Sequence, residues 1–316
     1  MRDALKSWIV APEHDQLRVD AFLRHRLPQL SRRELASAIA DRLFSLNGKV
    51  SQKGDRVRAG DVLMFHGPAA WLSSVPPANP KLELSVVYED SEILIIDKPA
   101  TMPTHGFSGR DQQTVANFIA STHPKLLGVG KSRWEPGILN RLDRDTSGLL
   151  MVAKTQESFI KLRKQFRHRE IVKTYWALVW GQTSASGTIT LPLAHHSADK
   201  TRMRAVASAD VKKQRTWNAS THYRRMTQNA RVALLELEMM TGVTHQIRVH
   251  LAAIGHPIVG DALYGAADSE SFGLKRQFLH ALKLQFRHPK TGRNFTVEAP
   301  LPNDLKKVLT RLKLWI

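Results

Sequence analysis

Residues 140–150 form the densest group of polar and charged side chains that could do chemistry, in a stretch that runs directly into an apolar one. Within it, the carboxylate of Asp143 is flanked by Arg141 and Arg144. Neighbouring cations hold a carboxylate in its ionised form, which can act as a nucleophile or as a base. The alternative is a turn whose aspartates cap backbone amides beside residues 146–148. The spacing by itself leaves both interpretations open.

A second polar segment, residues 241–257, has the pattern of a capped helix. Thr244 is the expected N-cap, and Gly255 followed by Pro257 is the expected end. The apolar face comprises Ile247, Leu251 and Ile254. Arg248 lies one turn into this helix and points away from that face, so we expect its guanidinium to meet a carboxylate from elsewhere in the chain.

Three histidines of this segment, His245, His250 and His256, raise the alternative of a metal site. Successive spacings of five and six residues do not place them on one helix face as i, i+4 ligands would be, and no HExxH pattern is present. We expect these histidines to be hydrogen-bonded internally or to face a bound partner. Neither a metal nor a cofactor is predicted, because the sequence also lacks a nicotinamide fingerprint and a P-loop.

Tyr175 lies in a strand-like stretch, residues 173–177, in which Lys173, Tyr175 and Ala177 face one way. Its ring could stack on a base and its hydroxyl could bond to one. For a lone tyrosine, the simpler interpretation is a half-buried sheet residue.

The overall charge indicates a polyanionic partner, because lysine and arginine outnumber aspartate and glutamate by 47 to 28 and give a net charge of +19. The basic residues are spread along the whole chain, which favours nucleic acid over a membrane surface. The absence of cysteine excludes disulfides and thiol chemistry. No apolar run is long enough for a signal peptide or a membrane span, so a cytoplasmic location is expected.

The sequence predicts an N-terminal tail, residues 1–16, followed by a small folded unit, residues 17–66. A first helix stops before Pro28, and a capping box at residues 31–34 starts a second helix that carries Leu35, Ile39 and Leu43. Asn47-Gly48 predicts a hairpin turn, and residues 62–65 a closing strand. Around the helix junction lies a basic cluster for which we expect RNA contact, although a solvated face is the alternative: Arg24, His25, Arg26, Arg32 and Arg33.

This unit resembles the S-four-type RNA-binding module, on the residues RVDAFLRHRLPQLSRRELASAIADRLFSLNGKV followed by RAGDVL. It departs from the module at Arg42-Leu43, where a glycine turn is usual. Residues 67–82 are rich in proline and serine and predict a linker. Residues 83–316 show strands and helices in irregular alternation, so the fold class predicted is α+β with a mixed, mainly antiparallel sheet, plus the small N-terminal α/β module.

Six motifs in order resemble the RluA-type family of pseudouridine synthases over residues 84–301: YEDSEILIIDKPATMPTHG, RLDRDTSGLLMVAKT, KTYWALVWG, NASTHY, TGVTHQIRVHLAAIGHPIVGDALYG and FLHALKLQFRHPKTG. By this resemblance Asp143 is the catalytic aspartate, Arg248 is the basic residue that pairs with it, and Tyr175 stacks on the target base.

The resemblance also implies that Arg141 helps to fill the gap left by a flipped nucleotide. We further expect RNA contacts by the nearby Arg144, Thr244 and His245. Asn140 and Val243 depart from the family pattern, which usually has histidine and arginine there. The activity implied is isomerisation of uridine to pseudouridine in structured RNA, with large-subunit ribosomal RNA the first expected substrate and tRNA the second. The rival interpretations are a non-catalytic RNA-binding or ribosome-assembly protein and, from the histidines, a metal-dependent nuclease. No protein partner is indicated.

Overall fold

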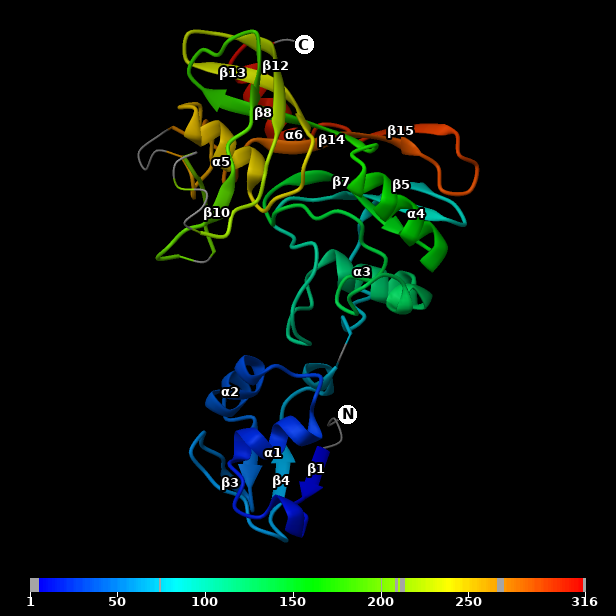
Figure 1. Cartoon of the computed structure of the whole chain (residues 1–316), viewed down its shortest axis with the longest axis vertical. Coiled ribbons are helices and arrows are strands. Elements are labelled where there is room, and N and C mark those ends of the chain that lie inside the picture. The colour runs from blue at the N-terminus through cyan, green and yellow to red at the C-terminus, as the bar shows by residue number, and fades with distance from the viewer. Residues whose placement is uncertain are drawn as a thin grey trace. The chain divides into compact units, whose positions relative to one another are not determined.

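The computed structural model describes residues 6–73, 75–199, 201–207, 210, 214–265 and 270–314 (Figure 1). The chain divides into two compact units. Unit 1 comprises Met1–Leu82, His105–Leu127 and Ser132–Trp134, and unit 2 comprises Glu83–Thr104, Gly128–Lys131 and Glu135–Ile316. Among the described residues, no helix is long and apolar enough to cross a membrane.

Unit 1 contains an antiparallel sheet of strand order β1-β4-β2-β3 with two helices over it. Its elements are β1 (Lys6–Ile9), η1 (Pro12–His14), α1 (Val19–Arg26), α2 (Arg32–Ala40), β2 (Phe44–Leu46), β3 (Lys49–Val50), β4 (Val62–Phe65), η2 (Ala69–Leu72), α3 (Val115–Thr122) and η3 (Pro124–Gly128). Apolar residues from both helices and the strands form its core, with Phe22, Leu35 and Phe44 among them. The first strand, β1, lies within the residues expected to form a tail.

The turns of unit 1 follow from local sequence. Ser31 accepts a bond from the Glu34 amide, and the Glu34 carboxylate accepts one from the Ser31 amide at 2.7 Å, which confirms the predicted capping box. Asn47 and Gly48, both with positive φ, join β2 to β3 as predicted. Arg42 takes the left-handed turn where a glycine is usual, with φ of 58°, so α2 ends at Ala40 and Leu43 falls outside it.

Unit 2 is built on a nine-stranded sheet of order β5-β6-β7-β14-β8-β13-β12-β9, with β15 paired to β14. All its strand pairs in the described chain are antiparallel except β7 with β14, which confirms the predicted α+β class. Its elements are β5 (Ser85–Glu89), β6 (Ile93–Lys98), β7 (Ser147–Ala153), α4 (Gln156–Arg167), β8 (Val172–Trp180), β9 (Ser186–Ile189), β10 (Leu193–His195), β11 (Met203–Ala205), β12 (Thr221–Gln228), β13 (Val232–Met239), α5 (Gln246–Ala253), β14 (Leu279–Arg287), β15 (Asn294–Glu298) and α6 (Asn303–Arg311).

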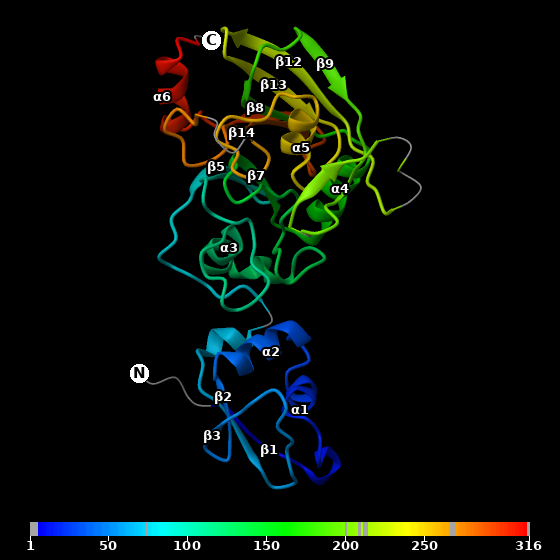
Figure 2. The same cartoon turned by 90° about the vertical axis from the view of Figure 1, so that its left-hand side faces the viewer.

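Helices cover this sheet through their apolar stripes. Thr155 caps α4 by accepting from the Ser158 amide, and α4 packs against β7 through Phe159 and Leu162. The helix α5, labelled in Figure 2, packs against β11 and β12 and contributes Ile247 and Leu251 to the largest core cluster. The sheet therefore holds both segments predicted to carry chemistry, the loop before β7 and the helix α5.

The start of β7 is fixed against β14 at very close range. Gly148 has a φ of 111°, and a Cβ there would lie 2.2 Å from the carbonyl oxygen of Ala281. Any side chain would force the two strands apart, so only glycine fits. The loop that ends at β7 is thereby tied to the centre of the sheet.

A pH-dependent stability is expected from His280 on β14, a fully buried residue whose Nδ1 lies 2.9 Å from Ser147 Oγ. Burial lowers the pKa of His280 to about 4. The unfolded chain, with an ordinary pKa of about 6.5, binds the proton first, so stability is present above about pH 6.5 and is lost as the pH falls toward 4. We expect the free energy of unfolding in urea to fall by about 2–3 kcal/mol from this residue between about pH 7 and about pH 4.5.

His280→Asn removes this titration, so that its unfolding free energy should fall less over the same interval. The control is His222→Asn, because His222 is exposed and pairs with Thr188 at the surface. An equal acid loss in the His280 variant and the wild type would contradict the assignment.

Candidate active site

The loop before β7 presents the carboxylate of Asp143 to the helix α5. Asp143 Oδ2 accepts a hydrogen bond from Arg248 Nη1 at 2.9 Å. The Asp143 side chain is 24% exposed, whereas Arg248 is buried. The structure therefore brings the predicted pair together, with the Asp143 carboxylate partly exposed to solvent and the Arg248 guanidinium buried behind it.

Arg248 uses its other nitrogens on a second carboxylate that the sequence analysis did not single out. Its Nε and Nη2 donate to Asp261 at 2.7 and 2.9 Å. Burial by itself would lower the pKa of Arg248, but the bonds and charges of Asp261 and Asp143 raise it above its ordinary value. The guanidinium is therefore a permanent cation between two carboxylates.

Tyr175 lies on β8 and is 3% exposed. Its pKa is raised first by burial and second by the charge of Asp143, which places the phenol within the electrostatic reach of that carboxylate. The hydroxyl consequently stays protonated at neutral pH. The ring belongs to the main core cluster, so a base could stack on it only after one face is uncovered.

Two buried side chains hold the Asp143 loop from behind. Lys98, at the end of β6, is fully buried and donates to the carbonyl oxygens of Pro99, Met102 and Arg144 at 2.8, 2.8 and 3.0 Å. Thr104 Oγ1 donates to the Leu142 carbonyl at 2.9 Å and accepts from the Leu142 amide at 3.1 Å. The backbone on either side of Asp143 is thus bonded to the body of unit 2.

Lys98→Met is expected to lower the free energy of unfolding by about 1–3 kcal/mol, because buried carbonyls that lose a donor keep their desolvation cost. Burial lowers the pKa of Lys98 to about 7, although the charge of Asp143 acts in the opposite direction, so removal of the buried ammonium offsets part of this loss. The matched control is Lys161→Met, which removes only an exposed i, i+4 pair with Glu157 and should change stability by less than about 0.5 kcal/mol. Urea unfolding of both variants decides it, and a Lys98 variant as stable as the wild type would refute the anchoring role.

The predicted start of the helix at Thr244 is wrong. The helix α5 begins at Gln246, and its N-cap, His245, has a left-handed φ of 56° and no side-chain cap bond. The physical reason is that Gln246 Oε1 accepts from the Val243 amide at 3.1 Å and from Thr241 Oγ1 at 2.7 Å, which closes the preceding turn. Thr244 is exposed on that turn. The helix ends as predicted, with Gly255 at a φ of 83°.

The residues that depart from the family pattern have structural partners. Asn140 Oδ1 accepts from the Met151 amide at 2.8 Å and its amide nitrogen donates to the Leu149 carbonyl, so it bonds to the backbone of β7. Val243 packs against an apolar cluster that includes Val249.

The other residues predicted to contact RNA surround the carboxylate unevenly. Arg141 and Arg144 are exposed, with Arg141 Nη1 at 3.6 Å from Glu135 and Arg144 Nε donating to the Thr101 carbonyl. His245 Nε2 lies 3.9 Å from Asp143 Oδ2, and its Nδ1 lies 2.7 Å from the Tyr264 hydroxyl. The structure therefore brings His245 together with Asp143 and Arg248.

The three histidines of this segment have separate partners. His250 lies between the hydroxyl of Thr221 and the Leu191 carbonyl, and His256 bonds to the Trp180 carbonyl. Within the described part of the chain, no group of three or more histidine and acidic residues is placed to hold a metal ion.

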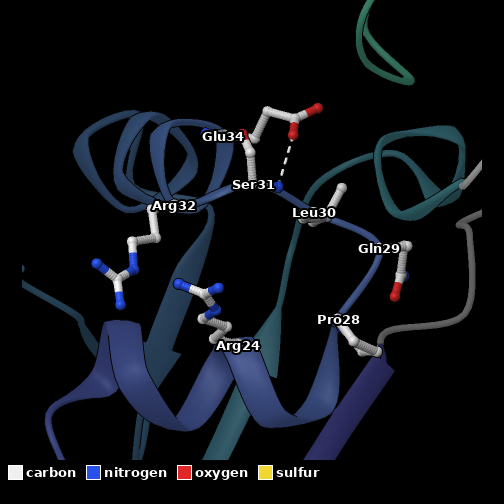
Figure 3. A pocket seen from close by; sticks show the side chains of 7 residues that line it. All are labelled: Arg24, Pro28, Gln29, Leu30, Ser31, Arg32 and Glu34. Atoms are coloured by element: carbon white, nitrogen blue, oxygen red, sulfur yellow. Dashed lines mark hydrogen bonds between the residues drawn. The ribbon is translucent and has the colours of Figure 1, made fainter.

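In unit 1, two residues of the predicted basic cluster, Arg24 and Arg32, line a pocket of about 640 Å³ between α1 and the start of α2 (Figure 3). Arg24 from α1 and Arg32 from α2 extend into this space, beside Ser31 at the helix N-terminus. His25, Arg26 and Arg33 are exposed and do not line it. The two guanidinium groups favour a phosphate, although the Glu34 carboxylate also lines the pocket and the Ser31 and Glu34 amides are already bonded in the capping box.

Comparison with known proteins supplies matches to both units. A family model described as RNA pseudouridylate synthase matches residues 92–253, and an S4 domain model matches residues 17–63. The ribosomal large subunit pseudouridine synthase D of Escherichia coli K12 is 34% identical over 304 residues, covering 92% of this chain and 89% of that protein. An uncharacterized RNA pseudouridine synthase of Synechocystis is 35% identical, covering 94% and 89%. The solved human RNA pseudouridylate synthase domain containing 4 superposes with a TM-score of 0.58 at 24% identity, covering 73% and 94%, which shows a shared fold.

Proposed function

Because the chain belongs to the RNA pseudouridylate synthase family and is an RNA pseudouridine synthase, we propose that Asp143 carries its chemistry and that its substrate is large-subunit ribosomal RNA. The observation that supports the catalytic assignment is the 2.9 Å bond between the partly exposed Asp143 carboxylate and the buried Arg248. Such a carboxylate is oriented and open to a substrate.

The reaction breaks the bond from ribose C1′ to N1 of uracil and joins C1′ to C5. The proton lost from C5 is balanced by the one gained at N1, so no oxidant or reductant is consumed. Asp143 either attacks the ribose or abstracts a proton from it to free the base. Arg248 orients this carboxylate in both routes.

The target uridine must leave its stack, which costs a few kcal/mol. Tyr175 supplies the aromatic face once one side of its ring is uncovered, and stacking returns about 1–3 kcal/mol. Arg141, Arg144, Thr244 and His245 lie on the rim of this site and contact the RNA around the flipped nucleotide. Exposed side chains on a loop and a turn can adapt to RNA without disturbing the core.

We further assign RNA recognition to residues 17–66, a linker to residues 67–82 and catalysis to residues 83–316, preceded by residues 1–16. The match to an S4 domain and the pocket of Arg24 and Arg32 support the first assignment. Arg33, exposed next to this pocket, adds a further positive charge to the same surface. The name of the Escherichia coli relative supports ribosomal RNA as the substrate, and hence a cytoplasmic site of action.

The test is tritium release from RNA labelled at C5 of uridine, since that hydrogen leaves in the reaction. Purified protein should release tritium from a large-subunit ribosomal RNA transcript, and much less from small-subunit ribosomal RNA or bulk tRNA. Release from tRNA alone would contradict the proposed substrate and leave the activity intact.

A further inference from the structure

The turn that follows α5, residues 260–265, holds a second carboxylate behind the candidate active site. The side chain of Asp261 is completely buried. Its Oδ2 accepts from Arg248 Nε at 2.7 Å and its Oδ1 accepts from Arg248 Nη2 at 2.9 Å. This is the bidentate arrangement in which a planar guanidinium is held with a defined orientation.

The backbone of the same turn holds the Asp261 side chain in place. Asp261 Oδ1 also accepts from the amides of Leu263 and Tyr264 at 2.9 and 3.1 Å. Gly260 has a φ of 76°, and a Cβ there would lie 2.2 Å from the Arg276 carbonyl, so the backbone at this point has no room to shift. The carboxylate is therefore oriented before any substrate arrives.

Tyr264 completes this support from the same turn. The Arg248 guanidinium lies over its ring at 5.1 Å from the centroid. Its hydroxyl receives a bond from the Met203 amide at 2.8 Å and meets His245 Nδ1 at 2.7 Å. The guanidinium is thus held on its edge by Asp261 and on its face by Tyr264.

With Nε and Nη2 committed to Asp261, the nitrogen that remains for Asp143 is Nη1. We propose that Asp261 is a positioning residue that sets the orientation of Arg248, and through it the orientation of the Asp143 carboxylate. The inference rests on the roles proposed above for Asp143 and Arg248. It predicts an effect of Asp261 on turnover that operates only through Arg248.

The test is a double-mutant cycle in the full-length protein, with tritium release from the RNA transcript as the assay. Asp261→Asn keeps the size of the side chain and removes its charge, and should lower kcat by about 10–100-fold, as the loss of an orienting partner commonly does. KM should stay within about threefold, because Asp261 is buried and touches no RNA. In the Arg248→Lys background the bidentate pair cannot form, so Asp261→Asn should change kcat by less than about threefold there.

A structural role would give a different result. If Asp261 only stabilised the fold, its effect on kcat would multiply with that of Arg248→Lys in the double variant, and that outcome overturns the proposal. A folded Asp261→Asn protein with wild-type kcat also overturns it. If Arg248→Lys itself leaves kcat unchanged, the proposed function of Arg248 fails together with the inference. If Arg248→Lys lowers kcat and Asp261→Asn leaves kcat at the wild-type value, the inference about Asp261 is wrong and the proposed function of Arg248 stands.

Two further variants keep the test decisive if Asp261→Asn does not fold. Asp261→Glu keeps the charge and displaces the carboxylate by one methylene, so it should unfold cooperatively and still lower kcat with KM retained. Wild-type kcat in that folded variant would overturn the proposal even if Asp261→Asn does not fold. The matched control is Asp20→Asn in unit 1, which removes a bidentate pair with Arg18 and should leave kcat within about threefold of the wild type.

Discussion

Asp143→Asn is expected to abolish pseudouridine formation, with turnover reduced by at least about 10³-fold, as removal of a reacting group commonly does. The amide keeps the size of the side chain and can still accept the bond from Arg248 Nη1, but it is a poor nucleophile and a poor base. RNA affinity should stay within a few-fold of the wild type, because the loss is confined to the chemical step. Single-turnover conversion and filter binding on the same transcript separate the two quantities.

The control for this prediction is Asp145→Asn, the same chemical change two residues further along the loop. It should keep turnover within about tenfold of the wild type, since the contact with Arg248 belongs to Asp143. Retained turnover in the Asp143 variant would remove the residue from the mechanism, whatever the control does.

The second large effect is expected in RNA affinity. Replacing Arg24 and Arg32 together by serine removes the two cations of the pocket in unit 1. Each phosphate contact contributes about 0.7–0.9 to the slope of log affinity against log salt, so the slope should fall by about 1.4–1.8. Affinity at about 0.1 M salt should drop by about tenfold or more, while conversion of bound RNA in a single turnover changes little.

A matched pair for this experiment is the double replacement of Arg18 and Arg56 by serine. Both belong to the same unit, but Arg18 is paired with Asp20 and Arg56 donates to the Gln16 carbonyl. Their loss removes the same formal charge without removing a free phosphate donor, so the salt slope should change by less than half as much. Equal changes in the two variants would show that net charge, and not the pocket, determines affinity.

Local signals predicted those elements whose cause is local. The capping box at Ser31 and the turn at Asn47-Gly48 involve residues three or fewer apart, so the sequence contains all the information they need. Arg42 was not predictable in this way, because an arginine in the left-handed turn is tolerated only by the packing around it. The same holds for β1, whose place is set by pairing with the distant β4.

The residues of the candidate active site likewise divide into those that the sequence predicted and those that depend on distant contacts. The contact of Arg248 with a carboxylate from elsewhere was predicted from helix geometry, and the identity of that carboxylate came from the family resemblance. Asp261 and Lys98 were missed, because each acts through contacts that no local pattern encodes. For Asp261 a signal was present: an aspartate directly after a glycine and three residues before a tyrosine, close behind the helix that carries Arg248. The reactive roles assigned to Asp143, Tyr175 and Arg248 stay predictions.

Mapping of pseudouridine in ribosomal RNA from cells that lack this protein tests the central claim most directly. At least one uridine of the large subunit should lose its modification, regain it when the wild-type chain is restored, and stay unmodified when the Asp143→Asn chain is supplied at the same level. Restoration of the modification by the Asn chain, or an unchanged large-subunit map in its absence, would contradict the account.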